Sequence, residues 1–206
     1  MPIAKGEPWG EPGDLPADAV LVRSDAEARA VLEEARRRRQ PFPPLGLLGG
    51  DLCRTLGGGG GEERLRAGEG VRFPVDIGEV LIDGHIRLFV AHLVARNRWW
   101  TRAYVAMNAQ YLTTRLGVWN LGPRAHPDDG LLDTYDAQLP PSQLGAVRAR
   151  LHHGAHLPHP GITERRTSAA DVELGRPLPV RLDGEAVGSA QRLVVRVLPD
   201  ALLVVA

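Results

Sequence analysis

The sequence predicts an α+β protein, in which a reduced α/β N-terminal unit is followed by a mainly antiparallel β-sandwich domain. Two short apolar segments flank a helical pattern between residues 19 and 48, and their short connections are typical of a parallel α/β unit. From Val75 onward the pattern changes to β segments separated by turn signals, which favours a sandwich. The expected divisions are a disordered or loosely docked N-terminus over residues 1–16, a reduced α/β unit over 17–70 and a β-rich domain over 71–206.

The first apolar segments define the α/β unit. A strand is expected at Ala19–Val22 and another at Leu45–Leu48, with a helix at Ala26–Arg39 between them. Ser24 or Asp25 is a suitable N-cap, because a short polar side chain accepts a hydrogen bond from the open N–H groups of the first turn. Arginines end this helix and complement its dipole, so we interpret them as a solvated helix end rather than as a phosphate or nucleic-acid patch.

A pair of glycines precedes the next expected helix. Gly49 and Gly50 lead into Asp51 and a helix at Leu52–Leu56, and glycines in this position allow a phosphate to approach backbone N–H groups. The five glycines of residues 57–61 are typical of a flexible loop. A glycine run can also hold phosphate, but the Lys-Ser/Thr pair of a P-loop is absent here. The segment alone is therefore a weak indication of nucleotide binding.

The β-rich part opens with an expected hairpin, in which Val75–Ile82 and Ile86–Ala95 meet at an Asp-Gly turn. Trp99 and Trp100 follow it, and they either stack on a ligand or pack in the core or at a sheet edge; packing is the interpretation we prefer. The remaining expected elements are strands at Arg102–Asn108 and Leu131–Leu139, irregular structure at Gln110–Gly122, a short helix from Pro141 to about His152, and a β segment at Thr163–Leu174.

The C-terminal stretch carries the candidate catalytic residues. A strand at Val180–Leu182 is followed by an Asp183-Gly184 turn and by Glu185, which places two carboxylates on a short, stiff element. Such a pair can take a proton from an alcohol while the second acid handles charge or metal. The alternative is an ordinary surface turn with two solvated acids. Two further strands, Arg192–Leu198 and Ala201–Val205, are expected to reverse at Pro199-Asp200.

Composition excludes several classes of protein. The chain has 25 basic and 25 acidic residues, so its overall charge favours neither nucleic acid nor an anionic membrane. A single cysteine, Cys53, excludes a disulfide framework and favours a reducing compartment. No apolar run approaches the roughly 20 residues of a membrane span, and the first residues do not resemble a secretory signal. We therefore expect a soluble, cytoplasmic protein with no integral membrane segment.

Two groups of residues are candidate metal ligands. Asp128, Asp129 and Asp133 lie around one turn, and hard cations such as Mg²⁺ prefer oxygen ligands. A plain acidic turn is the alternative that we favour on these residues alone. A zinc site built from His152, His156 and His159 is disfavoured, because the prolines beside His159 break any helix that would hold all three.

Taken in order, five segments of the chain resemble the diacylglycerol kinase-like lipid kinases, which are related to sphingosine kinases and NAD kinases. The resemblance covers roughly residues 18–206. The segments are Gly49–Gly57, Val75–Glu79, Met107–Ala109, Pro127–Asp133 and Val180–Glu185.

The resemblance implies an α/β nucleotide-binding domain, a β-rich lipid-binding domain and transfer of the γ-phosphoryl group of ATP to a lipid hydroxyl. Glu185 matches the presumed base of the family and Asp183 its supporting acid. Asp51 and Arg54 match a stretch near the nucleotide. The turn at Asp129 matches one that holds a structural Mg²⁺ in some members.

Two departures from the family pattern concern the nucleotide. Where the family has Gly-Gly-Asp-Gly-Thr, this chain has residues 23–27, Arg-Ser-Asp-Ala-Glu, so only Asp25 survives. The second glycine loop is shortened to Gly49-Gly50-Asp51, and about one βαβ unit precedes it, which indicates either a minimal domain or a truncated start. Side chains at glycine positions obstruct the approach of phosphate to backbone N–H groups.

We therefore expect a degenerate ATP site and a non-catalytic binding or regulatory role. The alternative is an active lipid kinase that uses ATP and Mg²⁺. The expected partners are a lipid or small hydroxylated molecule, and a second copy of the chain or a partner protein that covers the edge of the reduced sheet, with no nucleic acid. In the active case the nucleotide and metal would be held by Asp25, Gly49, Gly50, Asp51 and Arg54.

Overall fold

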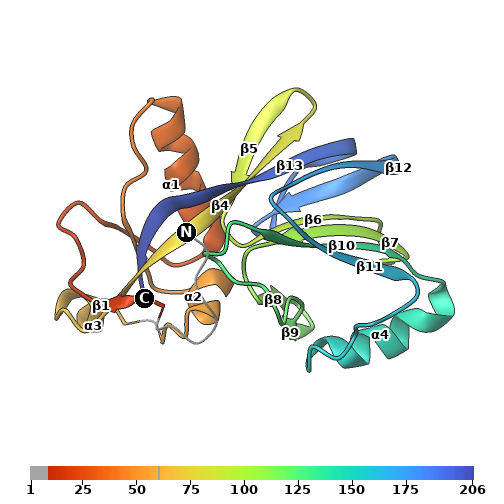
Figure 1. Cartoon of the computed structure of the whole chain (residues 1–206), viewed down its shortest axis with the longest axis horizontal. Helices are drawn as coiled ribbons and strands as arrows, with labels where there is room; N and C mark the ends of the chain where they lie inside the picture. Colours follow the sequence, from red (N-terminus) through yellow and green to blue (C-terminus); the bar gives the residue numbers. More distant parts are fainter. Residues whose placement is uncertain (1–8, 60) are drawn as a thin grey trace.

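The computed structural model describes residues 9–59 and 61–206, and most of its described strands form one large curled sheet, with α1, α2 and α3 at one end and α4 at the other (Figure 1). The helical end contains β1 (Glu11–Pro12), β2 (Val20–Val22), α1 (Asp25–Arg37), β3 (Leu45–Leu47), α2 (Asp51–Thr55) and α3 (Glu62–Arg66). The remaining elements are β4 (Val71–Ile82), β5 (His85–Phe89), β6 (His92–Arg96), β7 (Arg102–Met107), β8 (Tyr111–Thr114), β9 (Gly117–Asn120), β10 (Leu132–Gln138), a 3₁₀ turn (Pro141–Gln143), α4 (Leu144–Leu151), β11 (Ile162–Thr167), β12 (Ala169–Leu182) and β13 (Glu185–Val205).

The sheet connects the two predicted parts of the chain. Its order is β1-β4-β13-β12-β6-β7-β10-β11, while β2 and β3 extend it in parallel from the end of β13 and β5 pairs with β4. Strand β4 pairs antiparallel with β1, β5 and β13, and β13 also pairs antiparallel with β12. The predicted α+β class is therefore confirmed, and the division at residues 70 and 71 stays a prediction.

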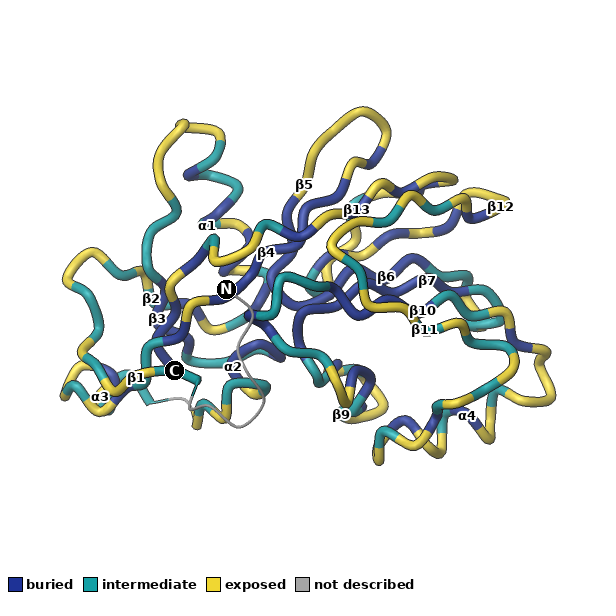
Figure 2. The backbone as a smooth tube through the Cα atoms, viewed as in Figure 1, coloured by how far each residue is buried: buried dark blue, intermediate teal, exposed yellow. Residues whose placement is uncertain are grey.

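The sandwich forms because the sheet folds over itself. Strands β4, β12 and β13 make one layer, and β6, β7 and β10 make the other. Apolar side chains from both layers meet in one buried cluster that includes Val80, Leu93, Leu132 and Val195. A second cluster lies between α1 and the helical end of the sheet, and Figure 2 shows buried residues running along β4, whereas buried and exposed residues alternate along much of β13.

Helix α1 begins where the sequence predicts. The hydroxyl of Ser24 accepts a hydrogen bond from the N–H of Glu27 at 3.2 Å, and the Glu27 carboxylate accepts one from the N–H of Arg23 at 2.7 Å. This reciprocal capping satisfies two donors at the helix start. Ala28 and Leu32 then pack into the core, where burial of a leucine contributes about 1.5–3 kcal/mol.

The C-terminal strands differ from the prediction. Residues on both sides of Pro199 belong to the single strand β13, which pairs with β4 before and after a register shift between Leu198 and Leu202. Asp200 has a φ of +51°, so it forms a bulge rather than a reversal. The strand continues because Leu202 and the residues after it are needed in the core beside β4.

Other local predictions also need correction. The expected strand Ile86–Ala95 is interrupted at Val90 and Ala91, and the irregular segment Gln110–Gly122 contains the β8–β9 hairpin. The segment Thr163–Leu174 is divided between β11 and β12 at Ser168. Helix α3 was not expected, because a glycine run precedes it.

The N-terminal stretch is docked where the structure describes it. Residues 1–8, part of the segment expected to be disordered or loosely docked, lie outside the described residues. From Trp9 onward the chain lies against the sheet: the Trp9 ring packs 4.8 Å from that of Phe73, and β1 pairs with the start of β4. In the described part of the chain, no helix is both long and apolar enough to cross a membrane.

Candidate functional site

The Asp183-Gly184 turn joins β12 to β13 at the boundary with α1, where both predicted catalytic acids lie. Asp183 has a φ of +50° and Gly184 one of +85°, a pair of values that suits a tight hairpin. The Asp183 side chain is fully buried and accepts hydrogen bonds from the N–H groups of Val90 at 3.1 Å, Ala91 at 2.9 Å and His92 at 3.0 Å. These bonds explain the break between β5 and β6, since the three donors point at a carboxylate instead of a strand.

Asp183 is therefore not a solvated surface acid, although Glu185 is 63% exposed. Burial, together with the negative charge of Asp25, raises the pKa of Asp183 to about 7, although the three N–H donors act to lower it. The two acids of the turn thus have different environments. Asp183 fixes the backbone, and Glu185 projects toward α1.

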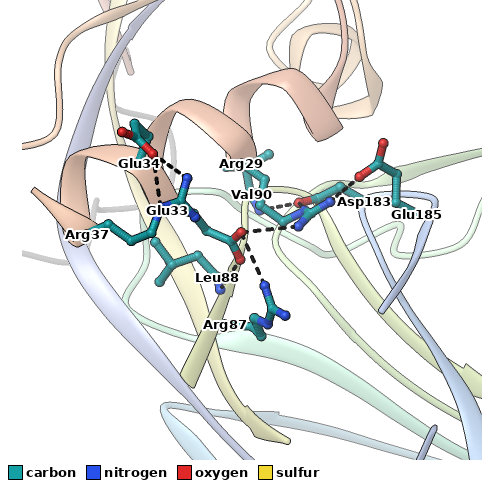
Figure 3. A network of polar contacts seen from close by, with 9 residues as sticks. All are labelled: Arg29, Glu33, Glu34, Arg37, Arg87, Leu88, Val90, Asp183 and Glu185. Carbon is teal, nitrogen blue, oxygen red and sulfur yellow. Dashed lines mark hydrogen bonds and ion pairs between the residues drawn. The ribbon is translucent and has the colours of Figure 1, made fainter. Parts of the chain in front are cut away.

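Arg29 of α1 holds this turn (Figure 3). Its side chain is 7% exposed, with Nε 3.7 Å from a carboxylate oxygen of Asp183 and Nη1 3.6 Å from one of Glu33. Its Nη2 donates a hydrogen bond to Glu185. One guanidinium therefore contacts three carboxylates.

Sequence analysis missed Arg29, although a signal was present. The helix buries residues 25, 28, 29, 32 and 35 as one stripe, and Arg29 is the cation in it. A cation inside an apolar stripe needs buried acids as partners, because an unpaired charge is costly there.

Asp25 and the glycine loop lie together, and the contacts of the Asp25 carboxylate are with that loop and the start of α2. The Asp25 carboxylate accepts hydrogen bonds from the N–H groups of Asp51 at 2.6 Å and Leu52 at 3.1 Å, which are the first donors of α2. A Cβ on Gly50 would lie 2.5 Å from the same carboxylate. The space in front of this helix is thus filled by an acid of the chain itself.

The other nucleotide candidates are close by. A Cβ on Gly49 would lie 2.6 Å from the carbonyl oxygen of Arg23, so the strand and loop approach closely there. Arg54 is exposed on α2. The Arg23 side chain lies 3.4 Å from Glu62 of α3.

Asp51 anchors the β8–β9 hairpin. Its carboxylate accepts hydrogen bonds from the N–H of Thr113 at 2.8 Å and from the Thr113 hydroxyl at 2.5 Å. His92 Nδ1 lies 3.8 Å from the same carboxylate, and His92 Nε2 has no hydrogen-bond partner among the residues described. Burial lowers the pKa of His92. Sequence analysis missed His92, since it stands alone in an apolar strand.

The predicted metal ligands divide into two groups. Asp128 lies with Asp76 and Asp200, with one oxygen of each carboxylate within 4.8 Å of the others, and the Trp9 indole donates to Asp128 at 3.1 Å. The other two face one cation instead: Arg166 contacts Asp129 and lies 3.6 Å from Asp133. The set predicted from the turn alone is thus not the one that the fold assembles.

Asp76 was missed because it lies inside β4, far from the acidic turn in sequence. Burial raises the pKa of Asp76. Burial also raises the pKa of Asp128 to about 7 and the pKa of Asp133 to about 6. Magnesium binding at the acidic turn stays a prediction.

An apolar pocket lies on the outer face of β7 and β10, beneath α4. Its cavity volume is about 60 Å³, which is below the roughly 300–1,000 Å³ of typical ligand pockets, so the pocket would have to open further to hold a ligand of that size. His156 is 2% exposed and lines it, and neither ring nitrogen has a hydrogen-bond partner among the described residues. Other lining residues are Trp100, Trp119, Tyr135, Val147 and Leu151.

The raised pKa of Asp25 makes stability depend on pH. Burial raises this pKa to about 6, against about 4 in an unfolded chain, so between these values the folded state binds a proton that the unfolded state does not. The free energy of unfolding contributed by Asp25 therefore falls as pH rises from about 4 to about 6, by roughly 3 kcal/mol in total.

Asp25→Asn is expected to flatten this decline, because asparagine does not ionise. Urea unfolding at several pH values measures it, and Asp18→Asn, at an exposed acid, is the control that should keep the wild-type slope. Parallel profiles for wild type and Asp25→Asn would contradict the assignment.

An α/β end joined to a folded β sandwich, with two carboxylates on the turn between β12 and β13, gives this chain a fold of the NAD kinase type. The model of the YegS C-terminal NAD kinase beta sandwich-like domain matches residues 79–206, more than half of the chain, and the chain belongs to this family. The predicted resemblance to diacylglycerol kinase-like lipid kinases is thereby confirmed.

Solved structures share the fold. A diacylglycerol kinase candidate from Bacillus anthracis str. Sterne superposes with a TM-score of 0.67 at 16% identity, over 91% of this chain and 77% of that one. A structure of a diacylglycerol kinase from the same strain gives 0.60 at 14% identity, over 91% and 75%. No curated protein matches the sequence.

Proposed function

We propose that this lipid-kinase-like protein has a degenerate ATP site and binds an apolar, hydroxyl-bearing ligand of lipid type without phosphorylating it. The observation that carries the proposal is the hydrogen-bonded position of Asp25 in front of α2. Phosphate binding at a helix start needs free N–H donors, and here the donors of Asp51 and Leu52 are already used by a carboxylate.

The start of α1 offers a phosphate no better site. Ser24 and Glu27 satisfy its capping donors, and Glu27 adds a negative charge where a triphosphate would bring several more. These residues do not fit ATP. In an active relative, ATP with Mg²⁺ supplies the phosphoryl group, and its charge must be matched by N–H groups and cations.

The presumed base is also restrained. Glu185 is hydrogen-bonded to Arg29, so its carboxylate already has a partner within the protein. A hydroxyl substrate would have to displace that contact to reach Glu185.

The apolar pocket beneath α4 supports the binding part of the proposal. Its walls are aromatic and aliphatic, and burial lowers the pKa of His156, so the imidazole is neutral near pH 7. A neutral imidazole donates one hydrogen bond and accepts another, which matches a hydroxyl group. The structural relatives from B. anthracis bear the name of diacylglycerol kinases, and a monoacyl or diacyl glycerol has this combination of groups. We place the protein in the cytoplasm, with a second copy or a partner protein on its sheet edge.

The alternative function is an active ATP-dependent lipid kinase. The position of the Asp183 turn favours it, because the turn contacts Arg29 of α1 and Glu185 remains 63% exposed. Label transfer from ATP to a lipid extract, lost in Glu185→Gln, would establish this alternative.

Thermal stability in the presence of each ligand tests the proposal, because a ligand that binds only the folded state raises the melting temperature. MgATP at millimolar concentration is expected to leave it unchanged, and a monoacylglycerol is expected to raise it. Ala146→Leu, on the exposed side of α4, should respond as wild type does, whereas Ala103→Leu, in the pocket wall, should lose the lipid response. A clear increase in the melting temperature with MgATP would contradict the proposal. So would an unchanged melting temperature with monoacylglycerol in wild type or in Ala146→Leu.

A further inference from the structure

The loop between β6 and β7 presents two tryptophans with an arginine against each ring. The guanidinium carbon of Arg96 lies 4.3 Å from the ring centroid of Trp100, and that of Arg98 lies 5.1 Å from that of Trp99. Both pairs have cation–π geometry. Trp99 is nevertheless 64% exposed, so the expected packing in the core does not account for it.

Two more arginines approach Arg96 from other elements. Burial lowers the pKa of Arg96, and the positive charges of Arg181 on β12 and Arg148 on α4 lower it further, which places all three cations near one another. Trp100 and Arg148 also line the same pocket. We call Arg96, Arg98, Trp99, Trp100, Arg148 and Arg181 the tryptophan–arginine patch.

The cations of this patch are unpaired. Among the described residues none of its arginines lies within 4.0 Å of an acidic group; Arg96 donates instead to the carbonyl oxygens of Asn97 and Arg98, and Arg181 to that of Gly184. Many arginines elsewhere in the fold do pair with acids, as Arg166 and Arg192 show. Since the whole chain has a formal charge of zero, the patch is a local concentration of positive charge and not a reflection of a basic protein.

The loop is also held in an unusual conformation. Trp100 has a φ of +63°, which is rare for a bulky residue and persists only where the surroundings enforce it. The ring of Trp100 packs edge-on against Trp119 at 5.6 Å between centroids and stacks under Arg96. The strained backbone at Trp100 thus belongs to a loop in which the neighbouring Trp99 is exposed to solvent.

An exposed indole beside unpaired guanidinium groups has a chemical match. Tryptophan prefers the boundary between lipid and water, where its ring is buried and its N–H remains solvated. Arginine binds phosphate oxygens in a planar, bidentate manner, and anionic headgroups concentrate such oxygens on a surface. We propose that the tryptophan–arginine patch docks this protein on an anionic lipid surface.

Docking of this kind would place the membrane beside the apolar pocket, because Trp100 and Arg148 belong to both. That consequence rests on the proposed lipid-type ligand, whereas vesicle binding does not depend on it. The two proposals can therefore fail separately: the first by absence of a thermal response to monoacylglycerol, and this one by absence of vesicle binding.

Co-sedimentation of the whole chain with vesicles tests the inference. Vesicles of phosphatidylcholine with phosphatidylglycerol should bind the protein, vesicles of phosphatidylcholine alone should bind it far less, and added salt should weaken binding. Trp99→Ala is expected to reduce binding, and Arg98→Glu to reduce it on the order of tenfold, because it replaces a cation by an anion at the surface.

The matched control is Arg39→Glu, since Arg39 is exposed and follows α1, a helix on the opposite side of the molecule from α4 (Figure 1). It makes the same change in net charge and should bind vesicles as wild type does. Equal losses in Arg98→Glu and Arg39→Glu, or binding to a single-stranded oligonucleotide but not to anionic vesicles, would overturn the proposal.

Discussion

Replacing Arg29 by methionine is expected to lower the free energy of unfolding by about 3–5 kcal/mol, since removal of one partner leaves buried charge uncompensated. Its guanidinium serves Glu33, Asp183 and Glu185, and the Asp183 side chain has no exposed surface. Methionine keeps the length and apolar stem of the residue, so the loss reports charge and hydrogen bonding more than packing.

Urea unfolding at a pH about one unit above the pKa of Asp183 measures this loss. The control is Arg37→Met on the same helix, because the Arg37 side chain is 64% exposed and pairs with Glu34 in solvent. Exposed pairs contribute about 0–1 kcal/mol. Equal losses in the two variants would show that Arg29 does not hold the turn.

Asp183→Ala is expected to cost about 3–6 kcal/mol, because it leaves the N–H groups of Val90, Ala91 and His92 buried without an acceptor. Asp183→Asn retains one acceptor oxygen and should fall between wild type and alanine. Denaturant unfolding measures both.

The chain supplies a closely matched control in Asp83→Ala. Asp83 stands at the same place in the β4–β5 hairpin, before Gly84 and with a φ of +48°, but it is exposed. Alanine there carries the same conformational cost of a left-handed residue, so the difference between the two variants isolates the buried carboxylate. If both variants lose the same stability, Asp183 is only a turn residue.

These two aspartates also show how far the sequence could predict the site. Both stand before glycine between apolar segments, so local chemistry predicts a tight turn for each, and the structure has both turns. Only the fold distinguishes them, because the donors to Asp183 come from residues 90–92, far away in the chain. Capping of α1 was predictable because its partners, Ser24 and Glu27, are near neighbours in the sequence.

The same contrast applies to the acids proposed as metal ligands. Asp128, Asp129 and Asp133 share one turn in the sequence, yet two of them face Arg166, and Asp128 lies with acids from β4 and β13. Register between strands decides such groupings, and spacing along the chain does not reveal it. The bulge at Asp200 brings that residue into the group, whereas the sequence indicated a reversal there.

The proposed loss of ATP binding depends on backbone N–H groups that already donate hydrogen bonds to side chains of the protein itself. Amide chemical shifts of a ¹⁵N-labelled sample, followed during titration with MgATP, report on those groups directly. If ATP does not bind, the amide chemical shifts of Glu27, Asp51 and Leu52 remain unchanged at millimolar MgATP. Saturable movement of these signals, with Asp25 displaced from the start of α2, would contradict it.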